Sequence, residues 1–317
     1  RFTGFEFQFD FAKGCHPFTR RDLADIQCAF DQHPGLGLQQ PGRTLKLGAK
    51  YFTQDVDAKL GMDDLAKGDV MFAATGVTSG DFLLGVLGEA LDVDLLLECS
   101  GQYTTREQGL RFVHAGVPRV LFSQPMVNEE AVDATLVYGV NHASLPADAR
   151  LVSNASCTTN CSVPLLKLLN EAVGLEYVSI TTIHSAMNDQ PVIDAYHHAD
   201  LRRTRSAFQS MIPVSTGLAR GIERLLPELS GRIQAKAIRV PTVNVSALDI
   251  TLQTARDTTG GEINRLLRAA ADGQYAGLLD YTELPHASCD FNHDPHSAIV
   301  DGSQTRVSGP RLVNLLV

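Results

Sequence analysis

The sequence predicts an α/β protein in two parts, a parallel sheet followed by an α+β domain with a mixed sheet. Between residues 94 and 139, short apolar runs alternate with a helical segment, which is the βαβ pattern of a parallel sheet. After residue 157, strands rich in β-branched residues alternate less regularly with helices, which indicates a mixed sheet with helices on one face. The chain of 317 residues is long enough for both domains.

The first sheet is predicted from short apolar runs that end at turns. Four such runs suit buried strands: Asp69–Gly76, Asp94–Ser100, Arg119–Ser123 and Ala134–Gly139. A helix is expected over Thr104–Ala115, where Leu110 and Val113 have helical spacing and Gly116 is a stop. A second helix is expected from Asp81.

The second part is predicted to contain longer elements. Helices are expected over Ser162–Val173, Leu218–Leu226 and Glu262–Ala271, and β structure over Tyr177–Thr182 and Ile238–Leu252. Gly174 and Pro227 follow the first two helices and would end them. The boundary between the two parts is expected near residues 150–156.

Composition excludes several classes of partner. The net charge is −9 and no lysine or arginine run is dense enough to follow a phosphate backbone, so we expect no nucleic acid. Arg202, Arg203 and Arg205 suit a small phosphorylated ligand instead. No apolar run reaches the roughly 18 residues that a membrane span needs. Six scattered cysteines favour reduced thiols in a cytoplasm, with no zinc-site spacing among them.

The segment 153–160 (SNASCTTN) carries the most specific chemistry. Cys157 stands at the expected first turn of a helix, where free N–H groups and the helix dipole favour a thiolate and can hold an oxyanion. His184 follows at the end of a strand-like run and would be its base. Spacing alone equally allows a buried cysteine and an unrelated loop histidine. Cys161 is expected to be a packed helix residue.

The segment SNASCTTN, with TIHS at 182–185, resembles the glyceraldehyde-3-phosphate dehydrogenase superfamily, and the resemblance runs from about Leu87 to Val317. It implies an incomplete Rossmann-like, partial NAD-binding domain over 87–156 and a catalytic domain over 157–317 that stops short of the family's C-terminus. Residues 1–86 are an atypical N-terminal segment. Within it, residues 48–86 resemble a C-terminal piece of class II fructose-1,6-bisphosphatases that lacks their acidic metal ligands.

Several later segments resemble the D-erythrose-4-phosphate dehydrogenases of that superfamily, notably 184–190 (HSAMNDQ), 280–285 (DYTELP) and 290–309. The resemblance implies oxidation of D-erythrose 4-phosphate to 4-phosphoerythronate with NAD, through a thioester on Cys157, with His184 as base. Ala186 and Met187 replace the Tyr-Thr pair that is usual in the glyceraldehyde-phosphate enzymes. Losing a hydroxyl bonded to an anion costs about 1.5 to 3 kcal/mol, which disfavours the shorter sugar phosphate.

The resemblance also carries over binding residues and an assembly. It implies that a small phosphorylated aldose is bound by Ser156, Thr158, Asp189, Thr216, Gly217 and Arg239, and the nicotinamide of NAD by Ser100, Gly101 and Ser123. Arg239 could alternatively be a solvated arginine at a strand edge. The family usually forms tetramers, partly through the long loop after His184, so a homo-oligomer is expected.

Two features leave other functions open. The family's glycine-rich turn for the NAD pyrophosphate has no counterpart here, since Gly35-Leu-Gly37 follows no apolar strand and Pro41-Gly42 interrupts the helix that should follow. A non-catalytic fused or truncated chain, or a glyceraldehyde-3-phosphate dehydrogenase, is therefore an alternative. A bisphosphatase would need a carboxylate metal cluster that the sequence does not show. His293 and His296 suit a metal site or a self-ordering loop, and we expect the loop and no metal.

Overall fold

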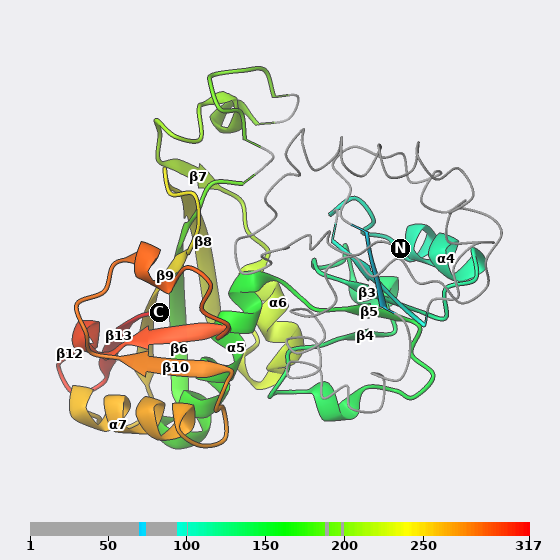
Figure 1. Cartoon of the computed structure of the whole chain (residues 1–317). Coiled ribbons are helices and arrows are strands. Elements are labelled where there is room, and N and C mark those ends of the chain that lie inside the picture. Colours follow the sequence, from blue (N-terminus) through cyan, green and yellow to red (C-terminus); the bar gives the residue numbers. More distant parts are fainter. Residues whose placement is uncertain (1–69, 74–93, 100, 188–189, 198–199) are drawn as a thin grey trace, which may run out of the picture. The chain divides into compact units, whose positions relative to one another are not determined.

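The computed structural model describes residues 70–73, 94–99, 101–187, 190–197 and 200–317 (Figure 1). The chain divides into two compact units, one reaching Ser156 and the other running from Cys157 to Val317. One unit contains a parallel sheet and the other a mixed sheet, so the predicted fold class is confirmed. The helix predicted from Asp81 and the Gly35-Leu-Gly37 segment lie outside the described residues.

The first unit contains a five-stranded sheet in the order β1-β2-β3-β5-β4, and all its strands run parallel. The strands are β1 (Val70–Ala73), β2 (Leu95–Glu98), β3 (Arg119–Phe122), β4 (Ala134–Thr135) and β5 (Leu151–Ser153). The predicted runs at 69, 94 and 119 therefore do form strands. Burial of β2, β3 and β5 explains why they are apolar throughout rather than alternating.

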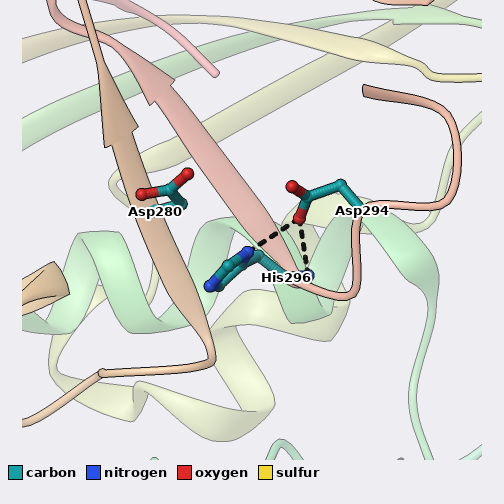
Figure 2. A group of neighbouring side chains, drawn as sticks. All are labelled: Asp280, Asp294 and His296. Carbon is teal, nitrogen blue, oxygen red and sulfur yellow. Dashed lines mark hydrogen bonds and ion pairs between the residues drawn. The ribbon is translucent and has the colours of Figure 1, made fainter. Parts of the chain in front are cut away.

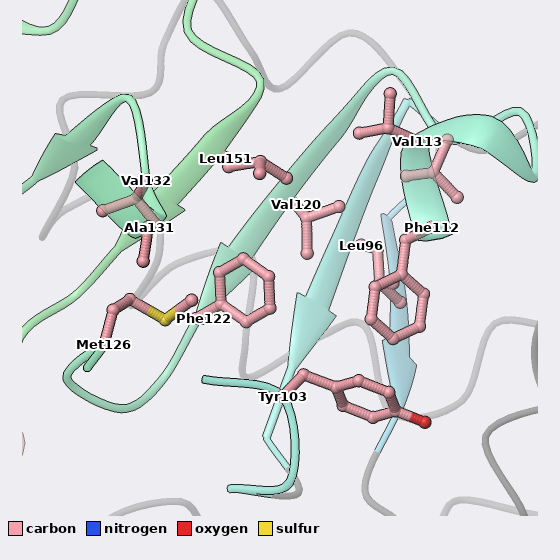
Figure 3. Packing of buried hydrophobic residues seen from close by; sticks show 11 residues of the cluster. Leu96, Tyr103, Phe112, Val113, Val120, Phe122, Met126, Ala131, Val132 and Leu151 are labelled. Atoms are coloured by element: carbon pink, nitrogen blue, oxygen red, sulfur yellow. The ribbon is translucent and has the colours of Figure 1, made fainter. Parts of the chain in front are cut away.

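Helix α4 (Arg106–His114) packs on this sheet. Its start is fixed by a capping box, in which the Thr105 hydroxyl accepts from the Gln108 N–H and the Gln108 side chain accepts from the Thr105 N–H. Phe112 of α4 and Phe122 of β3 are fully buried in the core cluster of Figure 3. A Cβ on Gly109 would lie 3.0 Å from the Phe122 ring, so a glycine lets the helix approach the sheet closely.

The strand predicted over Ala134–Gly139 is wrong beyond its first two residues. Only Ala134–Thr135 pairs in the sheet, as β4. The Asn141 side chain accepts from the Val137 N–H at 2.8 Å and donates to the Thr135 carbonyl at 2.9 Å. This amide competes with the ladder for backbone groups and turns the chain away, and Gly139 then takes a positive φ of 79°.

The second unit contains a six-stranded sheet in the order β12-β13-β9-β6-β8-β7. The strands are β6 (Leu175–His184), β7 (Ile212–Val214), β8 (Ile233–Arg239), β9 (Ala247–Thr254), β12 (Arg306–Ser308) and β13 (Leu312–Leu316). Strand β6 pairs parallel with β8 and antiparallel with β9, so the sheet is mixed. The β structure predicted over Ile238–Leu252 is two strands, β8 and β9, joined by residues 240–246.

Helices and a small second sheet complete this unit. The helices are α5 (Cys157–Val173), α6 (Leu218–Leu225) and α7 (Gly260–Ala271), and the small sheet pairs β10 (Leu279–Thr282) with β11 (Ala298–Asp301) in parallel. Helix α5 contacts α6, α7 and β6, and α7 contacts β10. The predicted stop at Gly174 is confirmed, since α5 ends at Val173 and Gly174 has a φ of +68°. No helix in the described ranges is long and apolar enough to cross a membrane.

Candidate active site

Cys157 is the first residue of α5 and is exposed. The turn before the helix contains Ala155, which has a positive φ of 56°. Its N–H donates to the Ser153 hydroxyl at 3.1 Å, and this bond offsets part of the roughly 1 to 2 kcal/mol that a left-handed conformation costs a residue with a Cβ. The chain thus enters α5 through a specified turn, with the thiol at the helix start.

His184 is the last residue of β6, and its Nε2 lies 3.8 Å from the Cys157 Sγ. Its other ring nitrogen, Nδ1, lies 2.7 Å from the carbonyl oxygen of Ser185. Because a carbonyl can only accept a hydrogen bond, Nδ1 must carry the proton. The neutral imidazole therefore presents the Nε2 lone pair to the thiol, as a general base requires. The two residues that spacing left possibly unrelated lie in contact.

Ser185, whose carbonyl orients His184, is itself held by Ser246, which lies just before the neighbouring strand β9. The Ser185 N–H donates to the Ser246 hydroxyl at 3.1 Å, and the two serine hydroxyls lie 3.3 Å apart. Strand β9 begins at Ala247, which pairs with Ile183 of β6, so sheet pairing sets this contact. The sequence prediction missed Ser185 and Ser246. No motif links two residues 61 positions apart, and only the β6–β9 register would have brought them together.

The acidity of Cys157 differs from the expectation of a thiolate. Desolvation is the largest influence and raises the pKa of the Cys157 thiol, while the backbone N–H groups of Thr158 and Cys157 lower it by a smaller amount. The residue is open to solvent on one side, yet protein atoms surround the sulfur closely enough for desolvation to prevail. The direction of this pKa shift opposes the expected thiolate, and His184 Nε2 is the neighbouring group that can accept the thiol proton.

Cys161 lies one helical turn beyond Cys157 and is buried. Burial first, and then the charge of Cys157, raise the pKa of Cys161 to about 12. A buried thiol with so high a pKa is unreactive at neutral pH. Its environment fits the predicted packed helix residue, and Cys157 is the exposed thiol of α5.

Arg239 is the last residue of β8 and pairs in register with His184 of β6. Strand β8 lies between β6 and β7, and Arg239 is only 8% exposed. The alternative of a solvated arginine at a strand edge is therefore wrong. Because β6 and β8 run parallel, their carboxyl ends bring an imidazole and a guanidinium to the same edge of the sheet. A buried arginine there suits an oxyanion or a phosphate.

Thr216 and Gly217 form the start of α6 and are exposed. The Thr216 hydroxyl accepts from the Leu218 N–H at 3.2 Å, and a Cβ on Gly217 would meet open space. Helix α6 packs on α5, where a Cβ on Gly221 would lie 3.1 Å from the Thr159 hydroxyl. The first turns of the two helices are thereby held close to each other, and helix N-termini favour an anion through their dipoles.

The remaining predicted substrate residues differ in how the structure places them. Ser156 directly precedes Cys157 and Thr158 directly follows it, and both are half-buried. Asp189 lies outside the described residues. In the arginine-rich loop, Arg205 lies 3.1 Å from Asp194. This exposed ion pair within the loop weakens the case for that arginine as a phosphate ligand.

Two of the three residues predicted to line a nicotinamide pocket are described. Gly101 follows β2 and Ser123 follows β3, and both are exposed beyond the carboxyl ends of adjacent parallel strands, which is where such sheets bind ligands. Gly101 has a positive φ of 71°, and a Cβ there would meet nothing within 4 Å. Ser100 lies outside the described residues.

Comparison with known families identifies the second unit. Residues 156–317 match the sequence model of the glyceraldehyde 3-phosphate dehydrogenase C-terminal domain. The match covers just over half of the 317 residues and spans the second compact unit from Cys157 to its last strand. It therefore includes the thiol, the imidazole and the buried arginine described above.

Proposed function

Because the chain belongs to the glyceraldehyde 3-phosphate dehydrogenase family, we propose that it oxidises a small phosphorylated aldose with NAD, specifically D-erythrose 4-phosphate to 4-phosphoerythronate. The observation that carries the proposal is the contact of the Cys157 Sγ with the His184 Nε2 at 3.8 Å, beside a buried Arg239. A thiol, a base and an anion-binding group at one strand edge are the parts that oxidation of a phosphorylated aldehyde requires.

In the first step, His184 accepts the thiol proton on Nε2, and the Cys157 sulfur adds to the aldehyde carbon. A carbon–sulfur bond forms, and the carbonyl oxygen takes a proton to become the hydroxyl of a hemithioacetal. The N–H groups at the start of α5 stabilise the negative charge that develops on this oxygen. The Ser185 carbonyl stabilises the imidazolium form of His184 through the bond that it accepts from Nδ1.

In the oxidation step, His184 removes the hydroxyl proton and the carbon–oxygen double bond re-forms, leaving a thioester on Cys157. NAD, when bound, supplies the hydride acceptor, and Gly101 and Ser123 are the described residues that would line its nicotinamide site. Water then attacks the thioester with His184 as base, the carbon–sulfur bond breaks, and the acid leaves. The balance is aldehyde, NAD⁺ and water to acid, NADH and a proton, with Cys157 regenerated.

The choice of substrate rests on the segment after His184. Ala186 and Met187 carry no side-chain hydroxyl, so these two positions offer no side-chain hydrogen bond to a phosphate. The Ala186 N–H is already bonded to the Thr242 carbonyl at 2.9 Å. Arg239, Thr216 and Gly217 remain as groups for the phosphate, which supports the longer aldose in our proposal.

The first experiment is NADH absorbance on mixing the chain with NAD and either erythrose 4-phosphate or glyceraldehyde 3-phosphate. We expect turnover that prefers the four-carbon substrate and is abolished by Cys157→Ser. Cys161→Ser is the matched control, since it changes a thiol on the same helix, and should retain turnover. Activity that survives Cys157→Ser, or is lost only in the control, would overturn the assignment of the nucleophile.

Arg239 is tested by replacement with Met, which keeps the chain length and removes the guanidinium. We expect KM to rise or kcat/KM to fall by about 10- to 100-fold, because a charge-assisted bond to an anion contributes about 1.5 to 3 kcal/mol. Lys236→Met on the same strand removes an exposed cation and should change little. Equal effects of the two substitutions would show that only general charge matters, and would remove Arg239 from the site.

Glyceraldehyde-3-phosphate dehydrogenase activity is the second candidate function, because the family match itself carries that description. It predicts preference for the three-carbon aldehyde and dependence on inorganic phosphate. A folded chain that neither binds NAD nor turns over either aldehyde would be a third outcome, and it would identify a non-catalytic member of the family. Calorimetric titration with NAD distinguishes this outcome from a slow enzyme.

We also propose that the chain forms a homo-tetramer in a reducing cytoplasm. The loop after His184 exposes Val192, Ile193 and Tyr196, each at least 70% accessible, and such residues are buried at subunit interfaces. The described cysteines are free thiols, which suits a reducing compartment. Light scattering should give a tetramer mass, and Ile193→Asp should reduce it, whereas Tyr177→Asp, on an exposed position of β6, should not.

A further inference from the structure

A group of metal-ligating side chains lies apart from Cys157 and His184, in the small parallel sheet. Asp280 of β10 and the pair Asp294 and His296 before β11 place one donor atom each within 4.8 Å of one another. Figure 2 shows the Asp280 carboxylate facing the His296 ring from the neighbouring strand. Sequence alone suggested His293 as the partner of His296, and the structure replaces it with two carboxylates.

Backbone pairing fixes this arrangement. The Leu278 carbonyl accepts from the Ser297 N–H at 2.9 Å, and Leu279 pairs with Ala298 in the parallel ladder. Asp280 pairs with Ile299 in this ladder, and His296 lies three residues earlier, in the segment that enters β11. The Asp294 Oδ1 accepts from the His296 N–H at 2.9 Å and lies 2.7 Å from its Nδ1, so both side chains are oriented before any ligand arrives.

The charges of the group are not balanced by the protein. The Asp280 carboxylate accepts from the adjacent Tyr281 N–H, and among the described residues no lysine or arginine pairs with Asp280 or Asp294. Within the group, His296 is the residue that can carry a positive charge. Its side chain and that of Asp294 are 23% and 28% exposed. Two carboxylates and one imidazole in a half-buried site form a donor set with excess negative charge.

We propose that Asp280, Asp294 and His296 bind one divalent transition-metal ion of the zinc type, which ties β10 to the segment entering β11. One nitrogen and two oxygen donors suit zinc, whereas magnesium and calcium take oxygen donors. Bonds of about 2.0 to 2.1 Å place neighbouring donors in a tetrahedral site roughly 3.3 Å apart. Side-chain rotation would open the 2.7 Å contact of Asp294 Oδ1 with His296 Nδ1 and bring the Asp280 carboxylate closer, and water would fill the fourth position.

The test must separate this site from the thiol, because Cys157 with His184 is itself a good zinc ligand pair. We would titrate the full chain carrying Cys157→Ser with zinc chloride by calorimetry, after removal of metal with a chelator. Cobalt(II) provides a second probe, since thiolate ligands give a charge-transfer absorption that a nitrogen and oxygen site lacks. The expected result is one ion per chain, bound without that absorption and not displaced by millimolar magnesium.

Two substitutions then locate the ion, each with a matched control. Asp280→Asn and His296→Gln should each weaken zinc binding about tenfold or more, because even residues that only orient ligands contribute 10- to 100-fold. Asp257→Asn and His114→Gln change an exposed aspartate and an exposed histidine elsewhere and should leave affinity unchanged. Absence of binding in the Cys157→Ser chain, or equal affinity in all four variants, would overturn the proposal. None of these measurements depends on dehydrogenase activity.

Discussion

Replacement of Ser246 by alanine would test whether the residue just before β9 positions His184, the base of the proposed mechanism. Ser246 touches neither Cys157 nor the thiol-facing nitrogen of His184, and it acts through Ser185. Its hydroxyl accepts from the Ser185 N–H at 3.1 Å, and the carbonyl of Ser185 accepts from His184 Nδ1 at 2.7 Å. Without Ser246, the half-buried N–H loses its acceptor and the carbonyl is free to turn away from the imidazole.

The magnitude follows from that one hydrogen bond. Its loss costs about 0.5 to 1.5 kcal/mol, and about 1.4 kcal/mol corresponds to a factor of ten in a conformational population. If the cost falls on the position of His184, the fraction of chains with Nε2 aimed at Cys157 decreases by up to about tenfold. The desolvated thiol, whose pKa is raised, then lacks its base near neutral pH.

The assay is the rate of Cys157 alkylation by iodoacetamide as a function of pH. We expect Ser246→Ala to slow alkylation up to about tenfold near pH 7 and to leave it within about twofold at high pH, where hydroxide replaces the base. Ser246→Thr keeps the hydroxyl and should restore the profile of the unaltered chain. Identical profiles for the alanine variant and the unaltered chain would refute the positioning role, because a merely structural loss would not depend on pH.

Two further predictions concern stability. Desolvation raises the pKa of Asp133, but hydrogen bonds from the Leu151 and Arg150 N–H groups and from Arg106 together outweigh it, so the pKa is lowered. The contribution of Asp133 to the free energy of unfolding is therefore present above about pH 4 and is lost as the pH falls through the lowered pKa. Asp133→Asn should cost about 1 to 3 kcal/mol at pH 7 and almost nothing at low pH, as urea titrations at several pH values would measure, and a constant difference would contradict this. Gly174→Ala should cost about 1 to 3 kcal/mol, because it combines a positive φ with a Cβ 2.8 Å from that of Ala255. Gly231→Ala is the control with positive φ and open space; an equal loss of stability would show that the contact is harmless.

Strong local signals explain which parts of the fold were predictable. The alternating run before His184 and the leucine-rich helix after Cys157 are long and periodic, so their type was predicted correctly. Their ends lie within two residues of the prediction, except that α5 begins at Cys157, five residues before the expected Ser162. The strand expected over Ala134–Gly139 failed because a single side chain, Asn141, takes backbone partners that pattern analysis assigns to the ladder. Short apolar runs are ambiguous for this reason.

The candidate site was predictable only through residues that belong to a motif. The segments 153–160 and 182–185 identify Cys157 and His184 as candidates, but the 3.8 Å contact between the two residues depends on how α5 packs on β6. The sign of the Cys157 pKa shift was wrong because helix position is local whereas desolvation depends on the whole surrounding structure. The burial of Arg239 likewise follows from strand order, which one strand's sequence does not contain.

Because His184 and Arg239 are in register on adjacent parallel strands, the sheet fixes the distance between these two backbone positions. Adjacent strands are separated by about 4.8 Å whatever side chains they carry. Substitutions at residues 184 and 239 can change the side chains there, but they cannot change the distance between the two backbone positions. Under the proposed function, adaptation to a longer or shorter aldose would occur in the connecting segments, such as 185–187 and 215–217, while the paired strand ends remain in place.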